Sequence, residues 1–563
     1  MAEQMQEDIA IRSKPSQQQG TERTPSGDSS PQEKKPARTL MLQGTASDVG
    51  KSLLTAALCR IAKQDGYAVA PFKSQNMSLN SYVTPDGKEI GRAQGMQADA
   101  CGIPASTDMN PILLKPSSDM ASQVVVHGRP LATMDALEYR NNYLQKAEPV
   151  VKEALDRLRS GYDLVVLEGA GSPAEVNLKD RDIVNMRLAG WADAPVLLVA
   201  DIDRGGVFAS IVGTLEILEP EERDRIKGFL INKFRGDVTL LKSGLDWLEQ
   251  RTGKPVLGVI PFLPNVTLED EDSLSLQHSA RAQSMNISNS LQPQKLDIAV
   301  IRLPRISNFT DADPLWAEED VALRYVSKAE EFGCPDAVLL PGTKNTLGDL
   351  AFLTAEGLDL ELTQYAAAGG WMAGICGGYQ MMGLTLSDPY GADSGSGMPS
   401  EAQGLGVFPL HTVFSEEKTT VRSQGLAAHW DEGELLPVEG YEIHMGQTET
   451  EPVGRTATNG TTDTAANPLL TLADGTKKGV ITRSGRQWGT YLHGILHNDE
   501  FRRSWLNAIR RSKGWEPIEG SLKFRERREA EFDRLADHVR QHVRMDLIYS
   551  MVHEESPGPD AGR

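Results

Sequence analysis

Residues 371–383 read Trp-Met-Ala-Gly-Ile-Cys-Gly-Gly-Tyr-Gln-Met-Met-Gly, an apolar run that ends at Cys376 and is followed by two glycines. The pattern is typical of a buried strand that turns sharply into a helix, because glycines let neighbouring chain approach without a Cβ clash. The helix N-terminus that follows favours thiolate over thiol. An ordinary buried cysteine would serve as a small hydrophobe, but the Gly-Ile-Cys-Gly-Gly context favours a nucleophile. We therefore expect an α/β fold here, with Cys376 as the first catalytic candidate.

The length and charge of the chain restrict its class. It has 563 residues, which indicates two or more domains. Its formal net charge of −20 argues against binding to nucleic acid or to an anionic membrane surface. The four cysteines have no C-x-x-C spacing, and no signal-peptide or membrane-spanning pattern is found. We expect a cytoplasmic, reduced protein without disulfides, cysteine-based zinc or membrane insertion.

Short apolar runs alternate with helical stretches on both sides of a polar segment. Before this segment the runs are 40–42, 68–70, 164–167, 196–200, 228–231 and 256–260; after it they are 296–301, 337–340, 371–375 and 488–493. Continuous apolar runs bounded by glycines suit parallel sheets covered by helices. We expect a disordered tail (1–38), an α/β domain (39–263), a linker (264–295), a second α/β domain (296–510) with a polar surface loop (450–475), and a C-terminal extension and tail (511–563) with a helix over 521–545.

A glycine-rich loop, Gly44-Thr-Ala-Ser-Asp-Val-Gly-Lys-Ser52, lies between the first apolar run and a helix-forming stretch. Backbone N–H groups of such a loop point at a phosphate, Lys51 adds a charge, and the Ser52 hydroxyl can bind Mg²⁺. Five residues rather than four separate Gly44 from Gly50, so the loop departs from the strict Walker A pattern. A plain strand-to-helix turn is the alternative interpretation, but it needs no Lys-Ser. We expect ATP and Mg²⁺ to bind through Gly44, Thr45, Asp48, Gly50, Lys51 and Ser52.

Two more charged residues are expected beside this loop. Glu168 ends the run 164–167, and in a P-loop fold such a strand runs beside the first, which would bring Glu168 near the metal. Lys73 follows another run and would reach the same crevice at the carboxyl ends of the strands. The alternative readings are a solvated loop glutamate and a surface lysine. The sequence thus predicts Ser52 and Glu168 as metal ligands and Lys73 as a nucleotide-binding residue.

A thiolate at Cys376 needs a base. His493 follows an apolar run and is the best candidate among the ten histidines. His444 could contact the substrate or be structural, and His497 is expected to be solvated. The backbone N–H groups of Gly342 and Gly377 could stabilise an oxyanion.

Three segments of the second half resemble the class I glutamine amidotransferases of the cobalamin pathway: Pro341-Gly-Thr-Lys-Asn-Thr346, Gly374-Ile-Cys-Gly-Gly-Tyr-Gln380 and Tyr491-Leu-His-Gly494. Most class I amidotransferases carry His-x-Glu at the base, whereas Ile495 occupies the glutamate position here. The cobalamin branch shares this departure. The resemblance therefore implies a dyad of Cys376 and His493 and names no third residue to orient the histidine.

The first half resembles the cobyric acid synthase family in the segments 44–52, 71–81, 108–116, 168–175 and 203–207. The match covers about residues 38–510, in order. Glu168-Gly-Ala-Gly also resembles the metal-binding segment of dethiobiotin synthetase, whose P-loop has the same extra residue, although the acidic residue that follows the second strand's lysine there has no clear counterpart here. The implied fold is a dethiobiotin-synthetase-like P-loop domain followed by a class I glutamine amidotransferase domain.

The resemblance implies an ATP- and Mg²⁺-dependent, glutamine-hydrolysing carbon–nitrogen ligase. Its substrates would be L-glutamine and adenosylcobyrinic acid a,c-diamide, whose b, d, e and g carboxylates become amides to give adenosylcobyric acid. One alternative is a cobyrinic acid a,c-diamide synthase, against which the segments 71–81 and 108–116 argue. Another is a partitioning-type switch ATPase, which would want a lysine near Thr45 and would not need Cys376. A lone glutaminase subunit would not need Lys51, and no oligomeric state is indicated.

Overall fold

The computed structural model describes residues 35–117, 121–135, 138–139, 143–268, 294–393, 395, 397–428, 430, 435–450 and 467–554, and the chain from Pro36 onward forms one compact unit. Most of the expected tail (1–38) and linker (264–295) lies outside the described residues. Arg38, which the sequence placed in the tail, instead begins the first strand. Ala37 before it is buried and donates its N–H to the Arg159 carbonyl.

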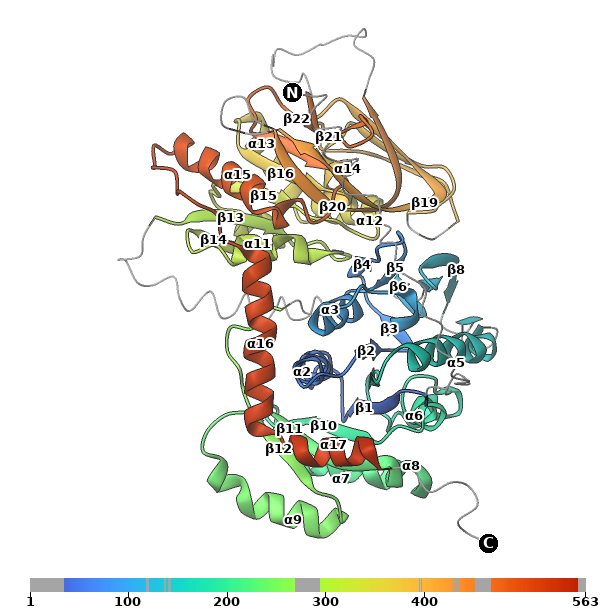
Figure 1. Ribbon diagram of the computed structural model, residues 1–563. Helices are drawn as coiled ribbons and strands as arrows, with labels where there is room; N and C mark the ends of the chain where they lie inside the picture. The colour runs from blue at the N-terminus through green and yellow to red at the C-terminus, as the bar shows by residue number, and fades with distance from the viewer. Residues whose placement is uncertain are drawn as a thin grey trace, which may run out of the picture. The chain divides into compact units, whose positions relative to one another are not determined.

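The first half of the chain builds a six-stranded parallel sheet in the order β12-β11-β10-β1-β9-β2 (Figure 1). Its strands are β1 (Arg38–Gly44), β2 (Val69–Phe72), β9 (Leu164–Glu168), β10 (Val196–Asp201), β11 (Ile226–Phe234) and β12 (Val256–Pro261). Each apolar run predicted in this half is a strand. Because β9 pairs with both β1 and β2, the carboxyl ends of these three strands meet at one edge.

Helices cover both faces of this sheet, as its apolar pattern requires. Met41 and Val165 pack into one buried cluster, while their neighbours Leu42 and Val166 pack into another. The helices are α2 (Lys51–Gln64), α3 (Arg92–Cys101), α5 (Leu144–Gly161), α6 (Met186–Ala192), α7 (Val207–Ile217), α8 (Pro220–Arg225) and α9 (Lys242–Thr252), with 3-10 turns η1 (Thr107–Met109), η3 (Val176–Arg181) and η4 (Val238–Leu241).

Two small sheets between β2 and α5 were not predicted. One has the order β3-β6-β7-β8, and the other is the antiparallel pair β4-β5. Their strands are β3 (Gln75–Met77), β4 (Ser81–Val83), β5 (Glu89–Gly91), β6 (Ile112–Pro116), β7 (Ala121–Val126) and β8 (Arg129–Asp135). Three of them have only three residues, too few for an alternating pattern to be recognised.

The second half builds an eleven-stranded sheet in the order β14-β13-β15-β16-β23-β22-β21-β19-β17-β18, with β20 paired to β19. The strands are β13 (Leu296–Ile301), β14 (Val321–Val326), β15 (Ala337–Leu340), β16 (Trp371–Ile375), β17 (Thr385–Asp388), β18 (Ser400–Gln403), β19 (Leu410–Ala427), β20 (Leu436–Thr450), β21 (Asn467–Leu472), β22 (Lys477–Ile481) and β23 (Gln487–Thr490). The first four and β23 pair in parallel. The surface loop expected over 450–475 is partly wrong, because 467–472 is a strand; residues 451–466 lie outside the description.

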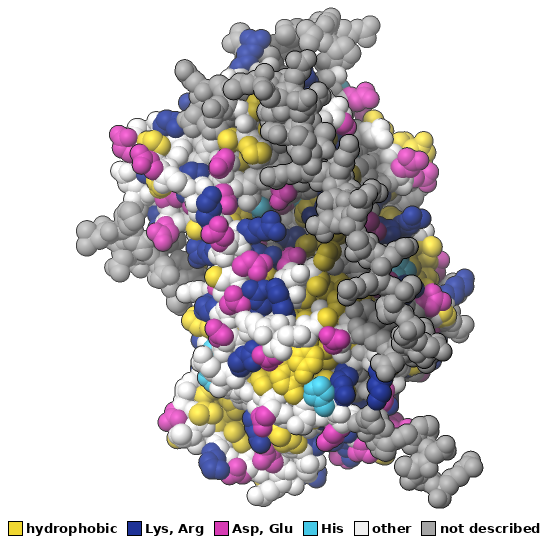
Figure 2. Space-filling model, viewed as in Figure 1, with side chains coloured by type: hydrophobic (Ala, Val, Ile, Leu, Met, Phe, Trp, Pro, Cys, Tyr) yellow, Lys and Arg dark blue, Asp and Glu magenta, His cyan; other side chains and the backbone are white. Residues whose placement is uncertain are grey.

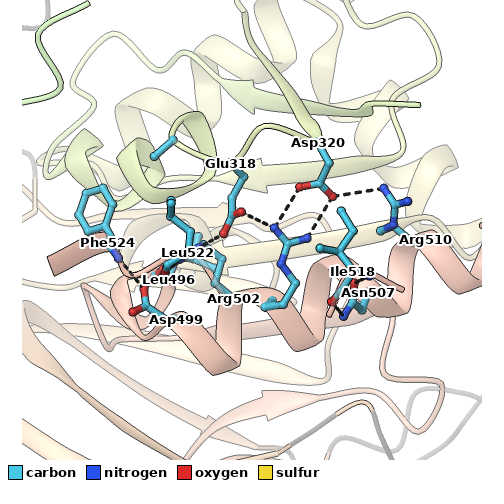
Figure 3. A network of polar contacts seen from close by, with 12 residues as sticks. Glu318, Asp320, Leu496, Asp499, Arg502, Asn507, Arg510, Ile518, Leu522 and Phe524 are labelled. Atoms are coloured by element: carbon cyan, nitrogen blue, oxygen red, sulfur yellow. Dashed lines mark hydrogen bonds and ion pairs between the residues drawn. The ribbon is translucent and has the colours of Figure 1, made fainter. Parts of the chain in front are cut away.

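The helical elements of this half are α11 (Asp313–Trp316), α12 (Thr346–Ala355), α13 (Leu358–Ala367), α14 (Gly377–Met381) and α15 (Asp499–Ser512), with 3-10 turns η5 (Phe309–Ala312), η6 (Ala329–Glu331) and η7 (Ile495–His497). Two buried arginines of α15 form ion pairs with the chain before β14. Arg502 binds Glu318 at 2.7 Å (Figure 3), and Arg503 binds Asp320 at 3.0 Å. These buried charges are matched by partners, which removes the penalty of burying them alone.

The C-terminal extension holds two helices where one was expected over 521–545. These are α16 (Phe524–His542) and α17 (Met545–His553), and the break between them falls where Val543 forms a β-bridge with Gly258. α16 packs across α2, where Arg60 donates to Asp533 at 2.7 Å (Figure 1). The extension therefore supports the helix that follows the glycine loop.

The surface mixes charges of both signs. On the face seen in Figure 2, Lys and Arg side chains are interspersed with Asp and Glu. Among the described helices, none has the length and apolar character needed to span a bilayer.

Candidate active sites

The glycine loop joins β1 to α2 at the edge where the strands end. Thr45 N–H donates to the Val199 carbonyl of β10 at 2.9 Å, which fixes the start of the loop. Gly50 has φ +96°, a left-handed conformation that favours glycine, and a Cβ there would lie 2.3 Å from the Asn232 amide nitrogen. Asp48 also has positive φ, and its carboxylate pairs with Arg204 at 3.4 Å. The loop is thus held by β10, β11 and the chain after β10.

Lys51, Ser52, Lys73 and Glu168 come together beside this loop. Lys51 Nζ donates to the carbonyls of Ala46 and Gly171, at 3.0 and 3.1 Å. Glu168 Oε1 accepts from Ser52 Oγ at 2.8 Å and from Lys73 Nζ at 3.0 Å. The register that pairs β9 with β1 and β2 produces this cluster. The structure therefore brings together the residues that the sequence assigned to the nucleotide and the metal.

Gln97 of α3 joins the same cluster and was not predicted. Its amide nitrogen donates to Glu168 Oε2 at 2.6 Å, so both carboxylate oxygens are held. No motif marks Gln97 in the sequence, because its role follows from α3 packing against α2 and β2.

Ser52 and Glu168 fit a magnesium ion that also binds phosphate. Within the described residues, no three His, Cys, Asp or Glu side chains gather as a protein metal site would require. Mg²⁺, however, is often held by one or two protein oxygens together with water and substrate phosphates. The two hard oxygen donors lie 2.8 Å apart, so one ion can contact both.

Cys376 lies between β16 and α14 in the conformation that an elbow requires. Its φ is +50° and ψ −108°, which is strained for a residue with a side chain. Its N–H donates to the Thr490 carbonyl of β23, and Gly378 N–H donates to the Pro341 carbonyl. Adjacent strands thus hold the thiol at the amino end of α14.

His493 is completely buried and its ring is fixed by Asp311 of η5. Nδ1 lies 2.7 Å from Asp311 Oδ2, while Asp311 Oδ1 accepts the Gly494 N–H at 2.7 Å. Burial alone would lower the pKa of His493, but the charges of Asp311 and Cys376 and their hydrogen bonds with it raise its pKa well above the ordinary value. His493 thus contacts both Cys376 and Asp311, which is the arrangement that a Cys-His-Asp triad would have. The carboxylate comes from η5 and not from the position two residues after the histidine, where Ile495 lies.

The remaining predicted residues of this site surround the triad. A Cβ on Gly342 would lie 2.9 Å from His493 Cε1, and a Cβ on Gly377 would lie 3.0 Å from the Thr343 nitrogen. Gly342 and Thr343 therefore lie against His493 and against Gly377, the residue that follows Cys376. His444 lines the cavity at Cys376 and stacks on Tyr491, with ring centroids 3.8 Å apart.

His497 is the one candidate base that faces elsewhere. Its Nε2 lies 3.0 Å from the Thr310 carbonyl, and the ring packs edge-on against Phe524. It is partly buried rather than solvated as the sequence suggested. His497 therefore connects η5 to the start of α16 through these two contacts.

Comparison with known proteins gives matches over both halves. The CobQ/CobB/MinD/ParA nucleotide binding domain matches residues 40–276, and the CobB/CobQ-like glutamine amidotransferase domain matches residues 297–501. The cobyric acid synthase of Geobacillus kaustophilus (strain HTA426) is 50% identical over 92% of this chain and 98% of its own length. That of Desulforamulus reducens (strain ATCC BAA-1160 / DSM 100696 / MI-1) is also 50% identical, with the same coverage.

These matches span both predicted domains in order and nearly the whole length of the relatives. The chain belongs to the cobyric acid synthase family.

Proposed function

We propose that the protein uses ATP and glutamine to convert the b, d, e and g carboxylates of adenosylcobyrinic acid a,c-diamide to primary amides, which gives adenosylcobyric acid. The observation that carries the proposal is that one chain holds two side-chain clusters. Lys51, Ser52, Lys73 and Glu168 gather beside the glycine loop, and Cys376, His493 and Asp311 gather at the elbow. One cluster can activate a carboxylate, and the other can supply nitrogen.

At the glycine loop, the protein would position the transferring phosphoryl group and neutralise its negative charge. A carboxylate is a poor acyl donor because its carbon is a weak electrophile with no good leaving group. Transfer of the γ-phosphoryl group of ATP to a carboxylate oxygen, with ADP as the leaving group, converts it to an acyl phosphate. The loop N–H groups and Lys51 support the negative charge, and Lys73 adds a second cation at the same edge. Mg²⁺ held by Ser52 and Glu168 would neutralise further phosphate charge.

At the elbow, the triad releases ammonia from glutamine. The Cys376 thiolate attacks the carboxamide carbon, and the His493 imidazolium gives its proton to the departing nitrogen, which leaves as ammonia. His493 then takes a proton from water, and the hydroxide attacks the thioester carbon to release glutamate and the thiol. Asp311 keeps the ring in the orientation and tautomer that both steps need. The backbone N–H groups of Gly342 and Gly377, which lie beside His493 and Thr343, would stabilise the oxyanion.

Ammonia then displaces phosphate from the acyl phosphate, which forms the amide. Ammonia released into bulk water would be protonated and lose its nucleophilic lone pair. This is a physical reason for both activities to share a chain.

The proposal is tested by product mass. Purified protein is incubated with cobyrinic acid a,c-diamide in its adenosylated form, ATP, Mg²⁺ and glutamine. Four successive replacements of a carboxyl OH by NH₂, each dependent on ATP, are expected. In a parallel assay, cobyrinic acid replaces the a,c-diamide as the substrate. Amidation of cobyrinic acid at a and c, together with no change in the mass of the a,c-diamide, would contradict the proposal.

A further inference from the structure

Another cavity lies between the two halves of the chain, beside the triad. Its volume is about 190 Å³, and Asp311 and Gly494 line it. Tyr441 lines it as well, and the Tyr441 ring stacks on His493 with centroids 5.2 Å apart. Among the described residues, none lines both this cavity and the one at Cys376. We call it the arginine cavity, and it is separate from the place where glutamine would react.

Two arginines from different halves of the chain meet in the arginine cavity. Arg92 begins α3 in the first half, and Arg422 lies on β19 in the second. Their guanidinium carbons lie 5.6 and 5.5 Å from the centre of the Tyr82 ring, which also lines the cavity. Arg422 donates to the Val83 carbonyl of β4 through Nε at 2.9 Å and through Nη2 at 2.7 Å. Because an aromatic face attracts a cation, the Tyr82 ring helps to hold both guanidinium groups in place.

The charges that line the arginine cavity favour an anion. The negative charge of Asp311 is compensated, because its oxygens accept from His493 and from the Gly494 N–H. Glu439 is exposed, so water and salt screen its charge. The two guanidinium groups therefore outweigh the negative charge that remains. A guanidinium carries five N–H groups in a planar fork, which matches the two oxygens of a carboxylate.

The arginine cavity lies at the same end of α2 and α3 as the glycine loop. Gln97 of α3 donates to the Ser52 carbonyl at the start of α2, at 3.3 Å. Farther along, Cys101 of α3 hydrogen-bonds to Cys59 of α2. The two helices therefore run in the same direction. Arg92 precedes Gln97 by five residues, which places it about 7.5 Å farther toward the end of the helix pair where the loop lies.

The size of the arginine cavity restricts what can enter it. Pockets that enclose a whole drug-sized ligand have volumes of roughly 300 Å³ or more, and this cavity has about 190 Å³. It can hold one carboxylate-bearing arm of a corrinoid but not the macrocycle itself. The proposed substrate carries several carboxylates around its rim. While one of them lies at the glycine loop, another can therefore enter the arginine cavity.

We propose that Arg92 and Arg422 bind a carboxylate on the rim of the corrinoid while another carboxylate of the same molecule is amidated at the glycine loop. This inference rests on the proposed function and adds to it the residues that recognise the substrate. Because the chain has a formal net charge of −20, a polyanionic substrate needs a local cationic site of this kind. The two arginines act as specificity residues and take no part in bond making at either centre.

The test measures corrinoid binding directly. Dissociation constants for adenosylcobyrinic acid a,c-diamide and for adenosylcobyric acid are measured by equilibrium dialysis, without ATP or glutamine, for Arg92→Gln, Arg422→Gln and Arg422→Lys. Arg486→Gln is the matched control. Arg486 also packs on an aromatic ring, that of Trp371, and donates to a backbone carbonyl, that of Gly369, but it lies outside the arginine cavity. The KM values for the corrinoid and for ATP are then measured for each variant.

Arg92→Gln and Arg422→Gln should each weaken binding of the a,c-diamide by roughly 10- to 100-fold, the range for losing a hydrogen bond to a charged group. The KM for the corrinoid should rise with it, while the KM for ATP stays near that of the wild type. Arg422→Lys should recover part of the affinity, because it keeps the charge but loses the planar fork. The wild type should bind the a,c-diamide more tightly than adenosylcobyric acid, in which four carboxylates are amides, and Arg422→Gln should narrow this difference.

Dissociation constants for the a,c-diamide that stay near that of the wild type in both glutamine variants would overturn the inference. Equal rises in the KM values for the corrinoid and for ATP would also overturn it, because they indicate that the arginines only hold the two halves together. If the wild type binds the a,c-diamide but forms no amide from it, the proposed function fails, and the dissociation constants still decide whether the arginines bind a corrinoid carboxylate. If the wild type does not bind the a,c-diamide, both fail.

Discussion

Replacing Asp311 with asparagine perturbs the base with little change in shape. In the native protein the two carboxylate oxygens accept from Gly494 N–H and from His493 Nδ1–H, each at 2.7 Å. Asparagine keeps one oxygen for Gly494 and presents its amide N–H to Nδ1. Nδ1 must then accept a hydrogen bond, so the ring proton moves to Nε2, and the nitrogen that should take the thiol proton is already protonated.

The expected magnitude follows from burial of the pair. The side chains of Asp311 and His493 are 3% and 0% exposed, and removing one partner of a buried ion pair costs about 3–5 kcal/mol. At about 1.4 kcal/mol per factor of ten, full expression of this cost in the transition state lowers kcat/KM for glutamine by roughly 10² to 10⁴. Ammonia-driven amidation should persist, because the phosphate site is untouched.

The assay is glutamate release at saturating ATP and corrinoid across a range of pH. Because Asp311 helps to raise the pKa of His493, the imidazolium survives to higher pH in the wild type. In Asp311→Asn the alkaline loss of activity should therefore move to lower pH. Asp313→Asn is the matched control. It removes a nearby negative charge that helps to raise the pKa of Tyr325, and it leaves the contact between Asp311 and His493 in place. Glutamine turnover near that of the wild type, with an unshifted pH profile, would refute the orienting role.

Three further substitutions test the nucleotide site, the base and the buried carboxylate of Glu442. Lys51→Ala should lower amidation from either nitrogen source by about 10²–10³-fold, because the transferring phosphoryl group loses a positioned cation; near-normal ATP-dependent turnover would move the nucleotide site elsewhere. His493→Ala should lower glutamine hydrolysis by roughly 10² or more with ammonia-driven synthesis intact, whereas loss in His444→Ala instead would relocate the base. Burial alone would raise the pKa of Glu442, but hydrogen bonds from its neighbours, with Lys478 among them, lower it from 4.5 to about 2. The ionised Glu442 therefore adds to the free energy of unfolding at pH values above its ordinary pKa, and this contribution is lost as the pH falls toward 2. At 1.36 kcal/mol per pKa unit, the contribution is about 3 kcal/mol. Glu442→Gln should therefore lower Tm at neutral pH and flatten the acid side of its pH dependence, as calorimetry can check; a curve parallel to that of the wild type would argue against the assignment.

The strands and helices that position the glycine loop and the Cys376 elbow could be predicted from the sequence. Long apolar runs specify buried parallel strands, and the glycine loop and the elbow each sit at a strand end, where side chains from neighbouring strands meet. Glu168 and Lys73 could be placed beside the loop for this reason, since β9 lies between β1 and β2.

Asp311 could not be predicted in the same way. It lies 182 residues before His493 in the chain, on a short 3-10 turn that has no motif, and only the folded sheet brings the two together. The sequence did show that Ile495 leaves the histidine without a local carboxylate, which indicates that another group must orient it. Arg92 and Arg422 were missed because they come from different halves of the chain, and only the contact of β19 with β4 brings both to the Tyr82 ring.

In the proposed function, nitrogen released at Cys376 is used at the phosphate site of the same chain. The most direct measurement is the corrinoid product mass for Cys376→Ser with glutamine or with an ammonium salt as the nitrogen source, in the presence of ATP and Mg²⁺. Glutamine-driven amidation is expected to be abolished while ammonium-driven amidation continues as in the wild type. Loss of both in a folded variant, or amidation that still proceeds from glutamine, would contradict it.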